Sequence, residues 1–429
     1  MSEKTSAGHF KSLVLRNMRC FRSAEIELDP RVTVLIGENG SGKTTVVEAL
    51  ASLSYGEGEG LSSFPVSRRA KSGEVSLFEE ERRRPAAGWK SSGVPSRLPE
   101  ERYLFAYGRY RRVYFADSGS PSPSPSFPAL LLDELAKRAN QRRTVTVFRP
   151  DNHLLRDLSR YLVALHFGSQ SDPRLETVWK RLNASLRELG QGIEGIVMEP
   201  GPQDYIPQIV RNGLPLELRE LSDGYQAILV ILFDLILRYV FLFPFLDDPL
   251  EGVALVAIDE VDLHLHPRWQ RTAVRQLVTL FPRTQFILTT HSPAVVQGAI
   301  DYKLGIITLR EEKGTTIPHM LTPEEMDELE GAEIGSVLLE EKLFGVDSRY
   351  SSKYSRVEDR IDSVRQKVET GRASEDERAQ LFKDLDTLQS LVAADEERRA
   401  DGSFLSQMTG LRKAFLRDLA AEIEKAKRS

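Results

Sequence analysis

The chain has 429 residues and a mass of 48.4 kDa, and its acidic side chains outnumber the basic ones, giving a formal net charge of −5. This length predicts two to three domains, and 41% hydrophobic with 28% charged residues is typical of a soluble globular protein. The net charge excludes a globally basic nucleic-acid coat protein. The single cysteine, Cys20, excludes a disulfide framework and suits a reducing compartment.

Apolar runs near the N-terminus predict strands at residues 12–15, 24–28 and 32–36, followed by a helix over 45–53. The third run is continuously apolar, as expected of a strand buried on both faces. Residues 1–60 are therefore the predicted first half of a nucleotide-binding head.

Residues 61–215 read as a mixed inserted lobe, and the Ser/Pro-rich tract at 117–128 predicts a disordered exposed loop. Residues 216–325 return to buried patterns and form the predicted second half of the head, with strands at 253–258 and 285–289. The apolar run at 227–246 contains Asp234 and Arg238, so it predicts a buried helix rather than a membrane span.

Residues 37–45 fit the phosphate-loop pattern G-x-x-x-x-G-K-[ST], between a buried strand and a helical stretch. The glycines allow backbone N–H groups to turn inward and bind phosphates at a helix N-terminus. Lys43 brings a mobile charge to the β- and γ-phosphates, and the Thr44 hydroxyl is a Mg²⁺ ligand. The pattern predicts ATP and Mg²⁺ as cofactors. The nucleotide-binding residues predicted in this loop are Gly37, Asn39, Gly40, Ser41, Gly42, Lys43, Thr44 and Thr45.

A second motif is the apolar run at 254–258 that ends in Asp259 and Glu260. A parallel strand of this kind delivers its last residues to the sheet edge where ligands bind in α/β folds. Asp259 is therefore the second predicted Mg²⁺ ligand. Glu260 is the predicted base that takes a proton from the attacking water.

Four ordered motifs together resemble the ABC-type ATPase superfamily, and within it the SMC/RecF-like branch. They are the phosphate loop, Leu221-Ser-Asp-Gly-Tyr-Gln226, the Asp259-Glu260 pair, and Thr290-His-Ser-Pro293. The segment Asn17-Met-Arg-Cys-Phe21 resembles the first strand-turn of that branch, where an arginine approaches the nucleotide, which assigns this role to Arg19. The resemblance implies an α/β fold: an ABC/SMC-like head of mixed and parallel sheet with flanking helices.

The same resemblance implies that two protomers sandwich two ATP molecules, each phosphate loop facing the partner's signature. Ser222 and Gly224 would then touch the γ-phosphate in trans, and His291 would sense it in cis as a catalytic residue. The signature departs from the usual Leu-Ser-Gly-Gly-Gln at Asp223 and Tyr225, and residues 51–150 contain no convincing glutamine-loop residue. These departures predict slow hydrolysis more than loss of binding.

Residues 258–270 resemble a narrower group, the stand-alone antiphage-defence ATPases such as the ATPase subunit of the Septu system. In that group the ATPase works with a separately encoded HNH-type nuclease and carries none itself. Asp384 and Asp386 lie in a helical pattern, which argues against a nuclease site in this chain. His264 and His266 permit a metal interpretation, but without a third ligand nearby we prefer a loop at a dimer interface.

Two further regions are candidates for partner contacts. Residues 66–115 carry twelve Lys or Arg against six Asp or Glu, with aromatic residues interleaved. This pattern suits DNA, and the alternative is a solvated loop with a buried strand at 103–107. Residues 326–429 predict a helical hairpin with narrow apolar seams and a further amphipathic helix, for assembly or partner docking or for packing on the chain's own core.

The sequence thus predicts an ATP-binding, slowly hydrolysing, cytoplasmic ATPase that forms homodimers and regulates a separately encoded nuclease in antiphage defence. No membrane partner is expected. Two alternatives stay open: a RecF-like DNA repair clamp, and a nucleotide-dependent scaffold that does not bind DNA.

Overall fold

The computed structural model describes most of the first 329 residues and one residue beyond them. The described residues are 9–53, 72–79, 87–90, 103–109, 158–188, 192–201, 205–329 and Ser374. The chain divides into two units, residues 1–346 and 347–429, and each is considered by itself. The predicted Ser/Pro loop lies outside the described residues, and so does the predicted helical tail apart from residues 326–329 and Ser374.

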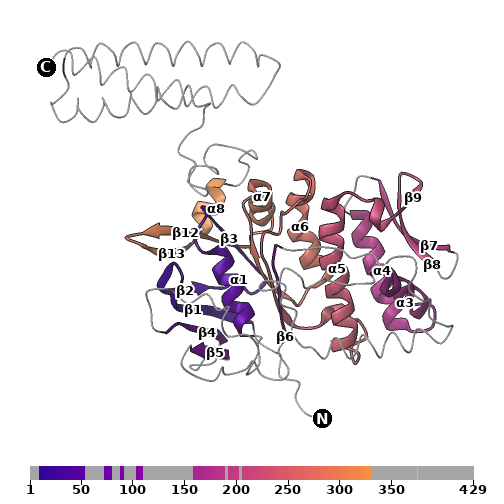
Figure 1. Cartoon of the computed structure of the whole chain (residues 1–429), viewed down its shortest axis with the longest axis horizontal. Helices are drawn as coiled ribbons and strands as arrows, with labels where there is room; N and C mark the ends of the chain where they lie inside the picture. Colours follow the sequence, from indigo (N-terminus) through magenta and orange to yellow (C-terminus); the bar gives the residue numbers. More distant parts are fainter. Residues whose placement is uncertain are drawn as a thin grey trace. The chain divides into compact units, whose positions relative to one another are not determined.

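The described part of the first unit contains both strands and helices (Figure 1). The strands are β1 (Phe10–Met18), β2 (Phe21–Glu27), β3 (Val32–Gly37), β4 (Glu74–Glu79), β5 (Ala87–Lys90), β6 (Tyr103–Tyr107), β7 (Ile193–Pro200), β8 (Tyr205–Arg211), β9 (Leu214–Glu217), β10 (Ala254–Ile258), β11 (Gln285–Thr289), β12 (Gly305–Glu312) and β13 (Thr315–Met320). The helices are α1 (Lys43–Ser52), α3 (Leu158–Gly168), α4 (Pro173–Glu188), α5 (Asp223–Leu242), α6 (Pro267–Leu280), α7 (Pro293–Asp301) and α8 (Pro323–Leu329).

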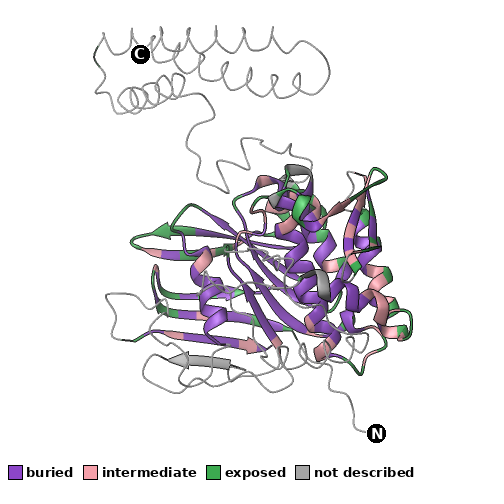
Figure 2. Ribbon diagram, turned by 45° about the vertical axis from the view of Figure 1, so that its right-hand side comes forward, coloured by how far each residue is buried: buried purple, intermediate pink, exposed green. Residues whose placement is uncertain are grey.

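A six-stranded sheet in the order β13-β12-β3-β11-β10-β6 forms the centre of the unit. Its strands are parallel except β13, which pairs antiparallel with β12. Both faces are covered, since Val34 and Ile36 of β3 face the core shared with α5, α6 and α7, whereas Leu35 faces the core shared with α1. Strands buried on both faces need apolar residues at successive positions, which explains the continuous apolar runs of β3, β10 and β11 (Figure 2).

A four-stranded antiparallel sheet, β2-β1-β4-β5, packs on the other side of α1. Strands β4, β5 and β6 come from the segment predicted as an inserted lobe. In the structure β4 pairs with β1, and β6 pairs with β10. Both sheets of the head therefore include strands from beyond residue 61, where the inserted lobe was predicted to begin. The α/β fold class is confirmed.

Helix α5 is the longest described helix and lies within the core. The stretch Gly224–Leu242 is long and apolar enough to cross a membrane, but 78% of its most apolar window is buried inside the molecule. Phe233 and Tyr239 are almost completely buried, with 1% and 0% exposure. The prediction of a buried helix is confirmed for residues 227–242, and the last four residues of the predicted run, 243–246, lie beyond the end of α5.

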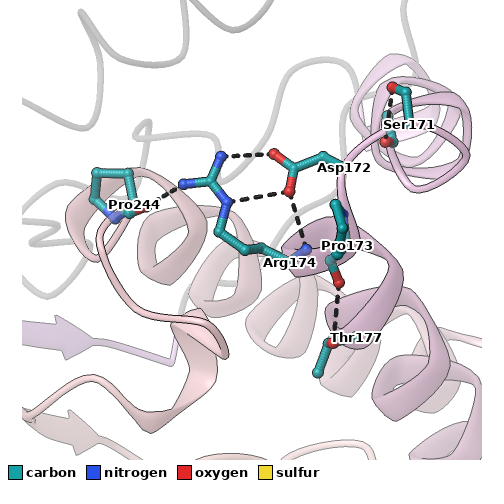
Figure 3. A network of polar contacts seen from close by, with 7 residues as sticks. Ser171, Asp172, Pro173, Arg174, Thr177 and Pro244 are labelled. Carbon is teal, nitrogen blue, oxygen red and sulfur yellow. Dashed lines mark hydrogen bonds and ion pairs between the residues drawn. The ribbon is translucent and has the colours of Figure 1, made fainter.

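The end of α5 is tied to the connection between α3 and α4 by one arginine (Figure 3). The Asp172 carboxylate accepts from the backbone N–H of Arg174 at 2.9 Å and from its guanidinium at 2.6 and 3.1 Å. The same guanidinium donates to the carbonyl oxygen of Pro244, just beyond α5. These bonds tie the start of α4 to the segment just after α5, and β7-β8-β9 form a small antiparallel sheet next to α4.

Candidate nucleotide-binding site

The phosphate loop connects β3 to α1 and is held tightly against the β1–β2 turn. Gly42 is the N-cap of α1 and has a φ of 103°, in the left-handed region that favours glycine. A Cβ atom at this position would lie 2.6 Å from Cys20 Sγ and 2.6 Å from the ring of Phe21. Glycine is therefore required both by the backbone angle and by the close packing. The N-terminus of α1 has no side-chain cap, as suits an anion site.

Lys43 folds back over this loop. Its Nζ donates to the carbonyl oxygens of Gly37 at 2.6 Å and Glu38 at 2.8 Å. Burial lowers the pKa of Lys43 to about 8, although nearby carboxylates, Asp259 first among them, act in the opposite direction. Within the described part of the chain, the buried Oγ of Ser41 has no hydrogen-bond partner. The ammonium and this hydroxyl are donors that a polyphosphate can use.

Thr44 and Asp259, the predicted Mg²⁺ ligands, lie side by side. The Thr44 hydroxyl donates to Asp259 at 3.0 Å, with the second carboxylate oxygen at 3.3 Å. Asp259 also accepts from the Thr289 hydroxyl at 2.7 Å, and its backbone N–H donates to the carbonyl oxygen of Tyr107 at 2.8 Å. A hydroxyl beside a carboxylate fits Mg²⁺, which binds to one or two carboxylates and takes phosphate oxygens as further ligands.

A metal site made by protein side chains alone is not found in the described ranges, where no group of three or more His, Cys, Asp or Glu could hold an ion. The donor set of Thr44 and Asp259 therefore fits a metal that arrives with the nucleotide. His264 and His266 flank Leu265 in the loop that follows β10, and His264 has a φ of 63°.

Glu260 and His291, the predicted catalytic residues, reach the same sheet edge from β10 and β11. Glu260 has a φ of 49°, and its backbone N–H donates to the Thr289 hydroxyl at 2.7 Å. Partial burial and the charge of Lys43 lower the pKa of His291, so its imidazole is neutral at pH 7. Because Lys43 influences the pKa of His291, and Glu260 influences both, the structure brings these side chains together.

The predicted signature residues lie at the start of α5. Ser222 is the N-cap of this helix. A Cβ atom on Gly224 would lie 2.1 Å from the carbonyl oxygen of His264, so the signature packs directly on the loop after Glu260. Tyr225, one of the two departures from the usual signature, is buried edge-on against Trp269 with ring centroids 3.8 Å apart. Among the described residues, neither Ser222 nor Gly224 forms a hydrogen bond with its own chain's phosphate loop.

Gln270 was not assigned a role from sequence, although it ends the segment that suggested a defence ATPase. Its Nε2 donates to the carbonyl oxygen of Leu265 at 2.9 Å, and its Oε1 accepts from the Ser292 hydroxyl at 2.7 Å. Ser292 is the N-cap of α7 and directly follows His291. Gln270 thus joins the loop that contacts the signature to the loop that carries His291.

Arg19 lies beside α1 and forms a salt bridge with Glu48, with 2.7 Å between Nη1 and Oε2.

The candidate DNA-binding segment is described only in part. Phe105 and Tyr107 are fully buried in β6, so these two rings are not available for stacking on bases, and the alternative of a buried strand is confirmed for them. Arginines 82–84 and Tyr110 lie outside the described residues.

Comparison with known proteins identifies the family of this fold. Residues 32–297 match the AAA_21 family of AAA domains, whose description names the AbiEii toxin and type IV toxin–antitoxin systems. The chain belongs to this AAA-domain family. Residues 5–55 also match the N-terminal domain of MukB.

Two curated relatives are similar to parts of the chain. The "Septu protein PtuA" of Bacillus mycoides (strain KBAB4) is 26% identical over 375 residues, which cover 80% of this chain and 45% of that protein. The "Retron Vc95 probable ATPase" of Vibrio cholerae serotype O1 biovar El Tor is 42% identical over 99 residues, or 23% of this chain and 19% of that protein. The chain thus spans less than half the length of these relatives. The resemblance to SMC/RecF-like defence ATPases is confirmed.

Among solved structures, a crystal structure of the SmcHead bound to the C-winged helix domain of ScpA is similar at 15% identity with a TM-score of 0.45. The alignment covers 74% of this chain and 99% of that one.

Proposed function

We propose that this chain is the ATPase of an antiphage-defence complex, in which ATP binding and slow hydrolysis regulate a separately encoded HNH-type nuclease. One observation carries the ATPase proposal: the Thr44 hydroxyl donates a hydrogen bond to the Asp259 carboxylate. This pair lies beside Lys43, at the start of α1, which has no side-chain cap. Membership in an AAA-domain family and the similarity to the Septu and retron proteins support the defence role.

The chain's own residues divide the work of hydrolysis. Lys43 and the Ser41 hydroxyl would bind phosphate oxygens, and Thr44 and Asp259 would hold Mg²⁺, which would supply positive charge to the phosphates. Glu260 accepts a proton from the attacking water. The hydrogen bond from its backbone N–H to the Thr289 hydroxyl holds Glu260 in place. His291, neutral at pH 7, offers an N–H to the γ-phosphate.

Assembly completes the site in this proposal. Among the described residues, Ser222 and Gly224 form no hydrogen bond with the phosphate loop of their own chain. In this proposal they act on the ATP bound to a second copy. The protein works in the cytoplasm, and the segment 326–429 serves assembly or nuclease docking. Deleting residues 350–429 should then leave ATP binding intact and abolish the higher complex, as native mass spectrometry can measure.

The proposed binding site is tested with Lys43→Ala. This variant removes the cation of the loop, and losing one partner of a hydrogen-bonded charge pair costs about 2–5 kcal/mol, so ATP affinity should fall by roughly 100-fold. Isothermal titration calorimetry measures the affinity. Lys303→Ala, a change at an exposed lysine that follows α7, is the control and should bind ATP as the wild type does. Equal affinity of Lys43→Ala and wild type would refute the proposal.

The proposed partner is tested in the native operon. The complex purified with and without ATP should contain a nuclease subunit, and its mass should change with the nucleotide. A complex of this chain alone in both conditions would contradict the nuclease proposal and leave the ATPase proposal standing.

A further inference from the structure

Glu48 is a buried carboxylate that has no part in the proposed hydrolysis. It lies on α1 one helical turn after Thr44, at a position where its neighbours Val46, Val47 and Ala49 are fully buried and apolar. The exposed fraction of its side chain is only 11%. A charge in such a place is costly unless it is paired, so its partner indicates its role.

The partner is Arg19, whose Nη1 lies 2.7 Å from Glu48 Oε2. Burial raises the pKa of Glu48, while Arg19 and, more weakly, Arg109 lower it and Asp259 raises it. Arg109 follows β6, the strand next to β10, and its charge and that of Asp259 act on the pKa of Glu48 more weakly than the charge of Arg19, which is in direct contact. Its place on α1, one turn after Thr44, puts Glu48 close to the predicted phosphate site, and Arg19 is the partner that favours its charged form most.

The turn that carries Arg19 is fixed in place by its backbone. Asn17 and Arg19 both have positive φ values, of 54° and 43°. The carbonyl oxygen of Cys20 accepts from the backbone N–H of Thr316 at 3.0 Å. Cys20 and Phe21 also lie against Gly42 of the phosphate loop, since a Cβ atom on that glycine would be 2.6 Å from both side chains. The Cα of Arg19 is thus held beside the phosphate loop, and what remains to be fixed is its long side chain.

We propose that Glu48 is a positioning residue that holds the Arg19 guanidinium beside the phosphate loop, ready to bind the phosphates of the nucleotide. The inference rests on the proposed ATP binding. Nη1 of Arg19 forms the ion pair with Glu48. A guanidinium has five N–H donors, so the others remain for an anion. The Arg19 side chain is 47% exposed, which leaves it open to a ligand on the side away from Glu48. Without the carboxylate, the side chain would sample many rotamers and spend little time in this orientation.

The test is a double-mutant cycle on ATP affinity. Glu48→Gln keeps the size of the side chain and removes its charge, and Arg19→Ala removes the guanidinium. Each should weaken ATP binding by roughly three- to tenfold, and the double variant should bind no more weakly than Arg19→Ala alone, because Glu48 acts through Arg19. A merely structural Glu48 would give losses that multiply in the double variant.

A matched control is the ion pair between Arg16 and Glu74, which also starts from β1 and has a distance of 3.3 Å. Glu74→Gln should leave ATP affinity unchanged. If Glu48→Gln does not fold, Glu48→Asp takes its place in the cycle, because it keeps the charge of this largely buried side chain but is one methylene too short to hold Arg19 in the same place. Wild-type affinity in Arg19→Ala, or losses that multiply in the double variant, would overturn the inference. A wild-type protein that does not bind ATP would instead overturn the proposed function.

Discussion

Two groups of charged side chains lie close together in this molecule, and they are built differently. The core cluster consists of Tyr107, Asp234 and Arg238. Asp234 accepts from the Tyr107 hydroxyl at 2.6 Å and from Arg238 Nε at 2.7 Å, and the Arg238 guanidinium lies over the ring of Phe105. One carboxylate faces one guanidinium, and the charges balance.

The edge cluster consists of Lys43, Asp259, Glu260, Asp262 and His291, at the carboxyl ends of β10 and β11 and the start of α1. It contains three carboxylates but one ammonium group, and that ammonium donates to backbone carbonyls. Like charges held close together raise the free energy of the folded protein. A balanced buried cluster is what a fold needs for stability, whereas an unbalanced one at a sheet edge is suited to binding a cation and a polyphosphate.

Tyr107 belongs to both regions. Its hydroxyl binds Asp234 on α5, the helix that begins at the signature, while its carbonyl oxygen accepts from the N–H of Asp259. The two clusters are therefore separated by one strand residue. Substitutions in the two clusters should nevertheless have different consequences. Those in the core cluster should lower the stability of the protein, and those in the edge cluster should lower the rate of ATP hydrolysis.

The largest effect is expected for Glu260→Gln. The amide keeps the size of the side chain but cannot take a proton from water, and a general base contributes about 10²–10⁴-fold, so ATP hydrolysis should fall by that factor. The melting temperature should be unchanged or higher, because one of three neighbouring negative charges is removed. Phosphate release and thermal unfolding measure the two quantities. Wild-type hydrolysis by this variant would show that Glu260 is not the base.

In the core cluster, Asp234→Asn should act mainly on stability. Arg238 would be left without its counter-ion in a place where its side chain is 17% exposed, and breaking a buried pair costs about 3–5 kcal/mol. Chemical denaturation measures the loss. Glu176→Gln on α4 is a matched control, because Glu176 and Lys180 form an ion pair of the same i,i+4 spacing with exposed side chains, and it should cost less than about 0.5 kcal/mol. Similar losses in both variants would remove the distinction between core and edge.

The sequence indicated that Lys43, Asp259, Glu260 and His291 of the edge cluster lie at one site, although it assigned no role to Asp262, because these four residues follow short, local patterns. The phosphate loop, the carboxylates after β10 and the His291 segment each adjoin an apolar strand, and parallel strands bring their carboxyl ends to one edge. The buried strands and α5 were recognisable for the same reason, as continuous apolar runs.

The core cluster and Glu48 could not be predicted in this way, because their partners are distant in sequence. Tyr107 and Asp234 are 127 positions apart, and the aromatic residues near β6 gave a pattern equally typical of a nucleic-acid surface. Strands β4 and β5 are short and lie between segments without clear periodicity, so the sequence alone did not assign them to the head. The one local signal for Glu48 was a charge among apolar helix positions.

The smallest expected effect sharpens the description of the edge cluster. Burial lowers the pKa of Lys43 to about 8, whereas a bound polyphosphate favours the ammonium form and raises this pKa again. Below pH 8 the lysine is charged with and without ATP, so affinity should be constant. Above pH 8 the free protein loses the proton and binding must restore it, so ATP affinity should fall by up to about tenfold per pH unit. Calorimetry between pH 7 and 9, in two buffers with different ionisation enthalpies, should show proton uptake that approaches one per ATP at pH 9.

Lys43→Arg provides the control, because a guanidinium stays protonated throughout this range. In this variant any proton uptake near pH 8 should disappear, even if the altered geometry weakens ATP binding at every pH. Uptake that persists in Lys43→Arg would assign the proton to another group of the edge cluster. A wild-type affinity that is flat from pH 7 to 9, with no proton uptake, would mean that Lys43 keeps its charge in the free protein. The three carboxylates around it would then balance the cost of its burial, and the edge cluster would resemble the core cluster more closely than its excess of negative charge suggests.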